Sequence, residues 1–137
     1  MNKIKYDSNS IKFITLFESM TGARVKDCIL NEKVFFIIEE NSMGKAIGRN
    51  GSNIKRIEAI LRKRIKLAEF SNDVLQLIKN IVYPVEINDI ANENGVITIQ
   101  GRDTNTKAML IGRDRQNINH VIKIVKRYFD VKEIKVV

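Results

Sequence analysis

The feature that most constrains this chain is an internal repeat, whose two copies lie 64 residues apart from Gly48 to Gly112. The same Ile-Gly-Arg triplet stands at residues 47–49 and at residues 111–113. The apolar positions that follow also match at this offset: Ile54 with Ile118, Ile57 with Val121, and Leu61 with Val125. Self-similarity at a fixed period indicates repeated structural units. The sequence therefore predicts two small modules, residues 1–70 and residues 71–137.

Hydrophobic patterning predicts the same order of elements in both modules: helix, strand, strand, short helix, glycine turn, helix, strand. In the first module the predicted helices cover residues 8–21, 43–47 and 52–64, with Asn41 or Ser42 as a cap, and the strands cover residues 24–30, 34–39 and 65–70. In the second module we expect helices over residues 74–82, 107–111 and 118–129, strands over residues 85–88, 96–100 and 133–137, and a hairpin turn at Asn94-Gly95. The helix after the first glycine turn is expected to bury Ile54, Ile57, Ile60 and Leu61.

The turn at the centre of the first module suits a phosphodiester chain. Its sequence is Ile47-Gly48-Arg49-Asn50-Gly51, and it joins a short helix to a second helix that starts at once. Small residues let another backbone come close. The new helix start offers unpaired N–H groups and the positive end of its dipole. Arg49 and Lys45 add full positive charge.

The charge of the chain also favours a polyanionic partner. The 137 residues hold 24 Lys and Arg against 16 Asp and Glu, a net charge of +8. Residues 1–70 account for +6 (14 basic against 8 acidic) and residues 71–137 for +2 (10 against 8). A basic surplus is typical of proteins that bind RNA, DNA or acidic membranes. Solubility, or the Lys- and Glu-rich composition of some thermophiles, is the alternative explanation.

Residues suited to catalysis or metal binding are scarce. With one histidine, His120, and one cysteine, Cys28, a catalytic pair or a zinc site is hard to assemble. The sequence has neither a Gly-x-x-x-x-Gly-Lys-Ser/Thr phosphate loop nor clearly paired carboxylates. We therefore expect no enzyme activity, no metal site and no cofactor. The lone cysteine, and the lack of a signal peptide or a membrane-length apolar run, predict a cytoplasmic protein.

The element order, together with Ile47-Gly48-x-x-Gly51 followed by Ile54, resembles the type II, prokaryotic-style KH fold over almost the whole chain, twice. The resemblance implies an α+β fold of two tandem type II KH modules, each a three-stranded mixed sheet packed with helices on one face. Two such modules in tandem resemble the archaeal NusA-like transcription factors. Bacterial relatives add an N-terminal domain and an S1 domain, for which 137 residues leave no room. This family implies RNA binding in transcription termination or antitermination.

In the first module, the resemblance implies a groove that holds about four nucleotides of single-stranded RNA. The residues predicted to bind this RNA are Lys45, Ile47, Gly48, Arg49, Asn50, Gly51, Ile54, Lys55 and Lys66. Ile47 and Ile54 are also candidates for the core, and the Arg62-Lys63-Arg64 run is typical of a solvated face. RNA polymerase is a further candidate partner.

The second module departs from the motif. Arg115 stands in place of the second glycine, and Asp114 puts a carboxylate where a phosphate would pass. We therefore expect weaker RNA contacts there, from Lys107, Gly112, Arg113 and Arg115, while Met109 is expected in the core. Two other roles stay open: a ribosomal or ribosome-assembly KH protein, and a protein-interaction platform, which the altered loop favours for residues 71–137.

Overall fold

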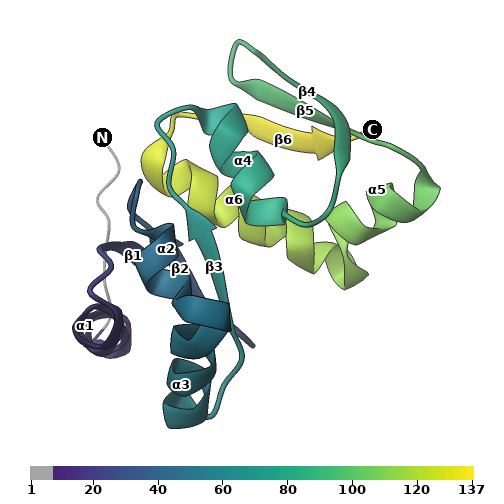
Figure 1. Ribbon diagram of the computed structural model, residues 1–137. Coiled ribbons are helices and arrows are strands. Elements are labelled where there is room, and N and C mark those ends of the chain that lie inside the picture. Colours follow the sequence, from purple (N-terminus) through teal and green to yellow (C-terminus); the bar gives the residue numbers. More distant parts are fainter. Residues whose placement is uncertain (1–7) are drawn as a thin grey trace. The chain divides into compact units, whose positions relative to one another are not determined.

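The computed structural model describes residues 8–137, which fold as two compact units, residues 8–71 and residues 72–137 (Figure 1). Each unit has the element order that the repeat predicts: helix, two strands, a short helix, a 3-10 turn, a second helix and a third strand. Each holds one three-stranded sheet with both parallel and antiparallel pairs. The α+β class is therefore confirmed.

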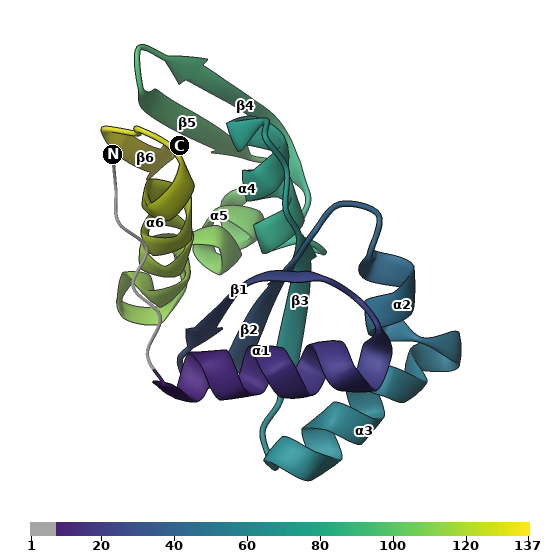
Figure 2. The ribbon, with the colours of Figure 1, turned by 90° about the vertical axis from the view of Figure 1, so that its left-hand side faces the viewer.

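In the first unit, the strand that precedes the short helix and the glycine turn lies at the centre of the sheet. Its elements are α1 (Ser8–Thr21), β1 (Val25–Leu30), β2 (Val34–Ile38), α2 (Met43–Ile47), the 3-10 turn η1 (Arg49–Gly51), α3 (Ser52–Leu61) and β3 (Ile65–Glu69). Strand β2 pairs antiparallel with β1 and parallel with β3. Figure 2 shows α1 running across the strands, with α2 and α3 beside it.

The core of this unit forms where the helices meet β2. Phe17 of α1 and Phe36 of β2 are fully buried, with their ring centroids 4.4 Å apart. Val34 and Ile38 flank Phe36 on the same side of the strand, and Ile57 of α3 completes the cluster. Burying large apolar side chains removes most of their surface from water, which is the main favourable term in folding. This core fixes the helices that carry the glycine turn.

In the second unit, the same plan recurs with longer elements around the hairpin. The elements are α4 (Val74–Val82), β4 (Ile87–Glu93), β5 (Val96–Gly101), α5 (Thr104–Ile111), the 3-10 turn η2 (Arg113–Arg115), α6 (Gln116–Tyr128) and β6 (Glu133–Val136). Strand β5 is central, antiparallel to β4 and parallel to β6. Its inward residues Ile97 and Ile99 are fully buried, as is Ile124 of α6.

The helix predicted over residues 52–64 ends earlier than expected. Helix α3 stops at Leu61 because Arg62 takes a left-handed conformation with φ 54°. The prediction that Ile60 is buried is wrong: its side chain is 56% exposed, so the buried stripe of α3 is narrower than its sequence indicates. Ser42 stands before α2 but does not cap it, since its hydroxyl accepts the N–H of Arg24 instead (3.2 Å).

The first strand of the hairpin begins later than expected. The sequence predicts residues 85–88, whereas β4 runs Ile87–Glu93. The Val85 N–H donates to the carbonyl of Val82 (2.9 Å). Val85 therefore belongs to the turn after α4 and not to the strand. The predicted hairpin at Asn94-Gly95 is confirmed, with φ 55° and 88° and with Glu93 paired to Val96. Such a two-residue turn fixes the register of both strands.

Candidate nucleic-acid interface

The first glycine turn has a backbone that demands glycine at one position. Gly48 ends α2 with φ 75° and ψ 173°, a region open essentially to glycine alone. Asn50 and Gly51 follow in left-handed conformations, with φ 55° and 72°. Helix α3 then begins without any side chain capping its first N–H groups. The turn therefore presents the positive end of a helix dipole and uncapped donors at one spot.

A side chain that the sequence interpretation overlooked holds this turn together. Asn53 Nδ2 donates to the carbonyl oxygen of Lys45 at 2.8 Å, which ties the first turn of α3 to the last turn of α2. A Cβ on Gly48 would lie only 2.8 Å from Cγ and Nδ2 of Asn53. The absence of a side chain at Gly48 therefore leaves room for the asparagine bridge. The sequence did indicate that Asn53 is important, because Asn117 matches it at the 64-residue offset of the repeat.

The structure brings most of the predicted contacts together around this turn. Lys45, Arg49, Asn50 and Lys55 are all exposed, and among the described residues no carboxylate forms an ion pair with the three cations. Gly51 is half-buried, and a Cβ there would meet no protein atom within 4 Å apart from those of its neighbours in the chain. Ile47 and Ile54 are half-buried, between the core and the surface.

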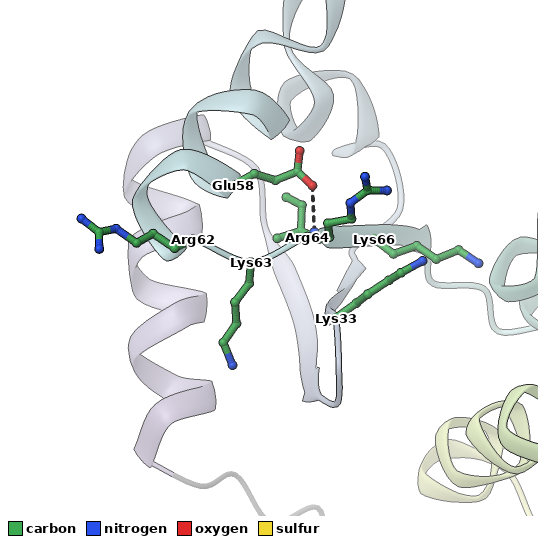
Figure 3. Close-up of a pocket in the computed structure, with 7 residues that line it drawn as sticks. Lys33, Glu58, Arg62, Lys63, Arg64 and Lys66 are labelled. Carbon is green, nitrogen blue, oxygen red and sulfur yellow. Dashed lines mark hydrogen bonds between the residues drawn. The ribbon is translucent and has the colours of Figure 1, made fainter.

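Lys66 is the predicted contact that the structure does not bring to the turn. It stands at the start of β3, just past the far end of α3, and a ten-residue helix is about 15 Å long. There it lines a pocket with Lys33 and Arg64 (Figure 3). Burial, followed by the charge of Lys33, holds the pKa of Lys66 below its usual value.

The second glycine turn follows the same path as the first. Gly112 has φ 76° and ψ 170°, Asp114 has φ 53° and Arg115 has φ 62°. Asn117 Nδ2 donates to the carbonyl oxygen of Met109 at 2.7 Å, and a Cβ on Gly112 would lie 2.6 Å from Asn117 Cγ. The arginine in place of the second glycine therefore leaves the trace of the turn unchanged.

What differs between the two turns is the set of exposed side chains. Arg113, Asp114, Arg115 and Lys107 are exposed, and Gly112 is half-buried. The prediction that Met109 lies in the core is wrong: its side chain is 50% exposed at the position that corresponds to Lys45. The second turn thus replaces a lysine with a methionine and adds one carboxylate.

No described residue suggests a metal site or a membrane span. Within residues 8–137, no group of three or more His, Cys, Asp or Glu side chains is placed to hold a metal ion. No helix in that range is both long enough and apolar enough to cross a bilayer. Cys28 is buried, and His120 is half-buried.

Several known proteins are similar to this chain over nearly its whole length. The family model described as KH domain matches residues 14–88. The probable transcription termination protein NusA of Methanococcus vannielii is 37% identical over 98% of this chain and 80% of its own length. The protein of the same description from Methanocaldococcus jannaschii is 30% identical over 100% and 77%. The crystal structure of APE1850 is 26% identical, with a TM-score of 0.75 over 96% of this chain and all of its own.

Proposed function

Because this chain belongs to the KH-domain family, among proteins similar to archaeal NusA, we propose that it binds single-stranded RNA and acts in transcription termination or antitermination. The observation that carries the proposal is the first glycine turn. Surface cations, uncapped helix N–H groups and open space at Gly51 occur there at one place. These are the features that a phosphate backbone needs in order to approach closely.

The proposed clamp works through positioning, without making or breaking bonds. Arg49, Lys45 and Lys55 pair with phosphate oxygens, and the Asn50 amide donates a further hydrogen bond. The open space at Gly51 leaves the sugar–phosphate chain room to pass. Such contacts need no cofactor and no catalytic group, so the protein is proposed to have no enzyme activity.

The half-buried isoleucines give the groove an apolar side. Ile47 ends α2 and Ile54 lies in the first turn of α3, on either side of the glycine turn. Each has part of its side chain in the unit and part at the surface. We assign them both roles, supporting the helices and lying beneath a base. Gly48 then serves by shaping the turn.

The second unit is proposed to be another type II KH module, so that the two modules are residues 1–70 and residues 71–137. The same turn geometry and the same asparagine bridge support this assignment. Lys107, Gly112, Arg113 and Arg115 are its proposed RNA contacts. They are weaker than those of the first unit because Asp114 repels phosphate and Arg115 occupies the place of a glycine.

The relatives' description as transcription termination proteins favours a place beside RNA polymerase over a ribosomal role. RNA polymerase is accordingly the proposed protein partner, in the cytoplasm. Retention of this protein on immobilised polymerase, and its absence from ribosomal subunits, is the expected outcome of a co-purification experiment.

Fluorescence anisotropy of a labelled tetranucleotide RNA tests the clamp. Asn50→Asp is expected to weaken binding at least about tenfold, or roughly 1.4 kcal/mol, because it places a carboxylate against phosphate. Asn72→Asp adds the same charge at an exposed position outside the turn and is the matched control. Wild-type affinity should fall with salt by about 0.7 log units per log salt for each phosphate bound. Equal binding by Asn50→Asp and wild type would contradict the proposal.

A further inference from the structure

A second basic site lies in the first unit, at the end of α3 opposite the glycine turn. A pocket of about 530 Å³ opens between the end of α3, the start of β3 and the turn between β1 and β2. Its lining consists of Lys33, Glu58, Arg62, Lys63, Arg64, Ile65 and Lys66. Five of these seven side chains are cationic and one is acidic. The pocket is therefore strongly positive.

The single carboxylate is already engaged by the backbone. Glu58 Oε2 accepts the N–H of Ile65 at 3.0 Å, the dashed line in Figure 3, which joins α3 to β3. Within residues 8–137, no carboxylate forms an ion pair with Lys33 or Arg64. Glu58 keeps its negative charge, but the lining as a whole holds four more cationic side chains than acidic ones.

Three of the cations extend toward the same side of the pocket. In Figure 3, Lys33, Arg64 and Lys66 reach to one side, while Arg62 and Lys63 point elsewhere. The Lys66 amine lies 5.8 Å from the centre of the Phe35 ring, a favourable cation–π distance that positions it. Its pKa is lowered by burial and by Lys33, so the two amines repel each other. An anion between them would relieve that repulsion.

The helix dipole accounts for only part of this cluster. Cations near the C-terminus of a helix interact favourably with its dipole, and this effect falls off beyond the last turn, which in α3 holds no basic residue. Arg64 and Lys66 follow the helix, and Lys33 comes from a different turn of the chain. The cluster is thus built from segments that are far apart in sequence, which is typical of a binding site.

We infer that Lys33, Arg64 and Lys66 bind backbone phosphates of the same RNA strand beyond the nucleotides held at the glycine turn. This inference rests on the proposed function. Lysine amines and an arginine guanidinium both suit phosphate, and the guanidinium can contact two oxygens at once. Since α3 is about 15 Å long, a strand that fills the clamp must extend past it to reach the pocket. Affinity should therefore rise with RNA length.

Anisotropy with a tetranucleotide and an unstructured twelve-nucleotide RNA tests the pocket separately from the clamp. The Lys33→Gln/Arg64→Gln variant changes two exposed side chains and leaves the half-buried Lys66 in place. We expect it to bind the longer RNA about tenfold more weakly, with a salt slope lower by about 0.7 for each phosphate that it no longer binds, and to bind the tetranucleotide normally. Lys12→Gln/Lys79→Gln removes the same charge from exposed positions outside the pocket and should change neither affinity more than about twofold.

Two results would overturn the inference while leaving the clamp intact. One is a wild-type protein that binds the tetranucleotide and the longer RNA equally well. The other is an equal loss of affinity in the pocket variant and its charge-matched control. Failure of the proposed function has a different signature, because Asn50→Asp would then bind the tetranucleotide as wild type does. A wild-type protein that binds neither RNA overturns both.

Discussion

The two glycine turns follow one backbone path although their sequences differ at half of their positions. Gly48 and Gly112 have φ within one degree of each other, and Asn50 and Asp114 within two degrees. Yet the first turn reads Gly-Arg-Asn-Gly and the second reads Gly-Arg-Asp-Arg. The shape of the turn is therefore set by what the two copies share, and its chemistry by what they do not.

The shared parts are the first glycine and the asparagine five residues later. Each asparagine donates to a carbonyl in the last turn of the preceding helix, at 2.8 Å for Asn53 and 2.7 Å for Asn117. The second glycine is not needed for the trace, since Arg115 takes the same left-handed conformation as Gly51. In the first unit, Gly51 instead leaves open space beside the turn, which the proposed clamp uses to admit the RNA backbone.

The largest expected effect is on stability, and it differs between alanine substitutions at the two glycines of the first turn. Gly48→Ala should lower the free energy of unfolding by about 3 kcal/mol, because alanine is strained at φ 75°, ψ 173° and its Cβ meets Asn53 at 2.8 Å. Gly51→Ala should cost only about 1 kcal/mol, for the left-handed φ alone. Urea denaturation of the intact chain measures both changes.

Hydrogen exchange at the amides of α2 and α3 locates the damage within the chain. Protection should fall in those helices for Gly48→Ala and stay close to wild type in α6. Equal costs for the two alanines would mean that the asparagine bridge does not make the first glycine special.

The order of elements could be predicted from the sequence because the apolar residues recur at helical or strand spacing. The predicted bounds are wrong where the backbone conformation of a few residues determines the end of a helix or the length of a strand. Helix α3 stops at Arg62, whose left-handed conformation no periodicity reveals. Strand β4 extends through Ala91 and Asn92, which favour strands weakly, because the Asn94-Gly95 turn pairs them with β5.

Parts of the candidate site were predictable and others depended on tertiary structure. The glycines and cations of the first turn could be recognised from their spacing. The position of Lys66 could not, because it depends on where β3 lies relative to α3. Met109 was misassigned for a related reason: α5 is apolar on several sides, and which side faces outward is decided by packing.

The next largest effect comes from exchanging the side chains of the two turns. The Asn50→Asp/Gly51→Arg variant gives the first turn the second turn's residues and should weaken tetranucleotide binding by more than about tenfold. The fold should persist, since Arg115 already adopts the required φ of 62° in the second unit. The circular dichroism spectrum should match wild type.

The reverse exchange tests whether the second turn lacks only side chains. Asp114→Asn/Arg115→Gly should let that turn hold RNA, so that a variant chain also carrying Asn50→Asp/Gly51→Arg regains at least part of its tetranucleotide binding. No recovery would show that Met109, in place of Lys45, also limits the second turn.

A smaller effect is expected from removing the asparagine bridges. Asn53→Ala and Asn117→Ala each delete one side-chain hydrogen bond and should lower the free energy of unfolding by about 1 kcal/mol. Only Asn53→Ala should also weaken RNA binding, by a few fold, because it loosens the turn that carries the clamp. Thermal unfolding and anisotropy measure the two effects. If Asn117→Ala lost as much RNA affinity as Asn53→Ala, the two turns would contribute equally to binding, contrary to the proposal.

The smallest effect concerns how the helices before the two turns begin. Helix α5 is capped by Asp103, whose carboxylate accepts the N–H and the hydroxyl of Thr106, both at 2.8 Å, whereas no side chain caps α2. Those hydrogen bonds from Thr106 lower the pKa of Asp103. Because the pKa is lowered in the folded state, the stabilisation is present above the ordinary aspartate pKa of about 4 and is lost as pH falls through the lowered value.

Hydrogen exchange in α5 should therefore speed up on acidification relative to α2. Asp103→Asn keeps a good capping residue but cannot titrate, so it should remove that difference. An unchanged pH dependence in Asp103→Asn would assign the acid sensitivity to another carboxyl group.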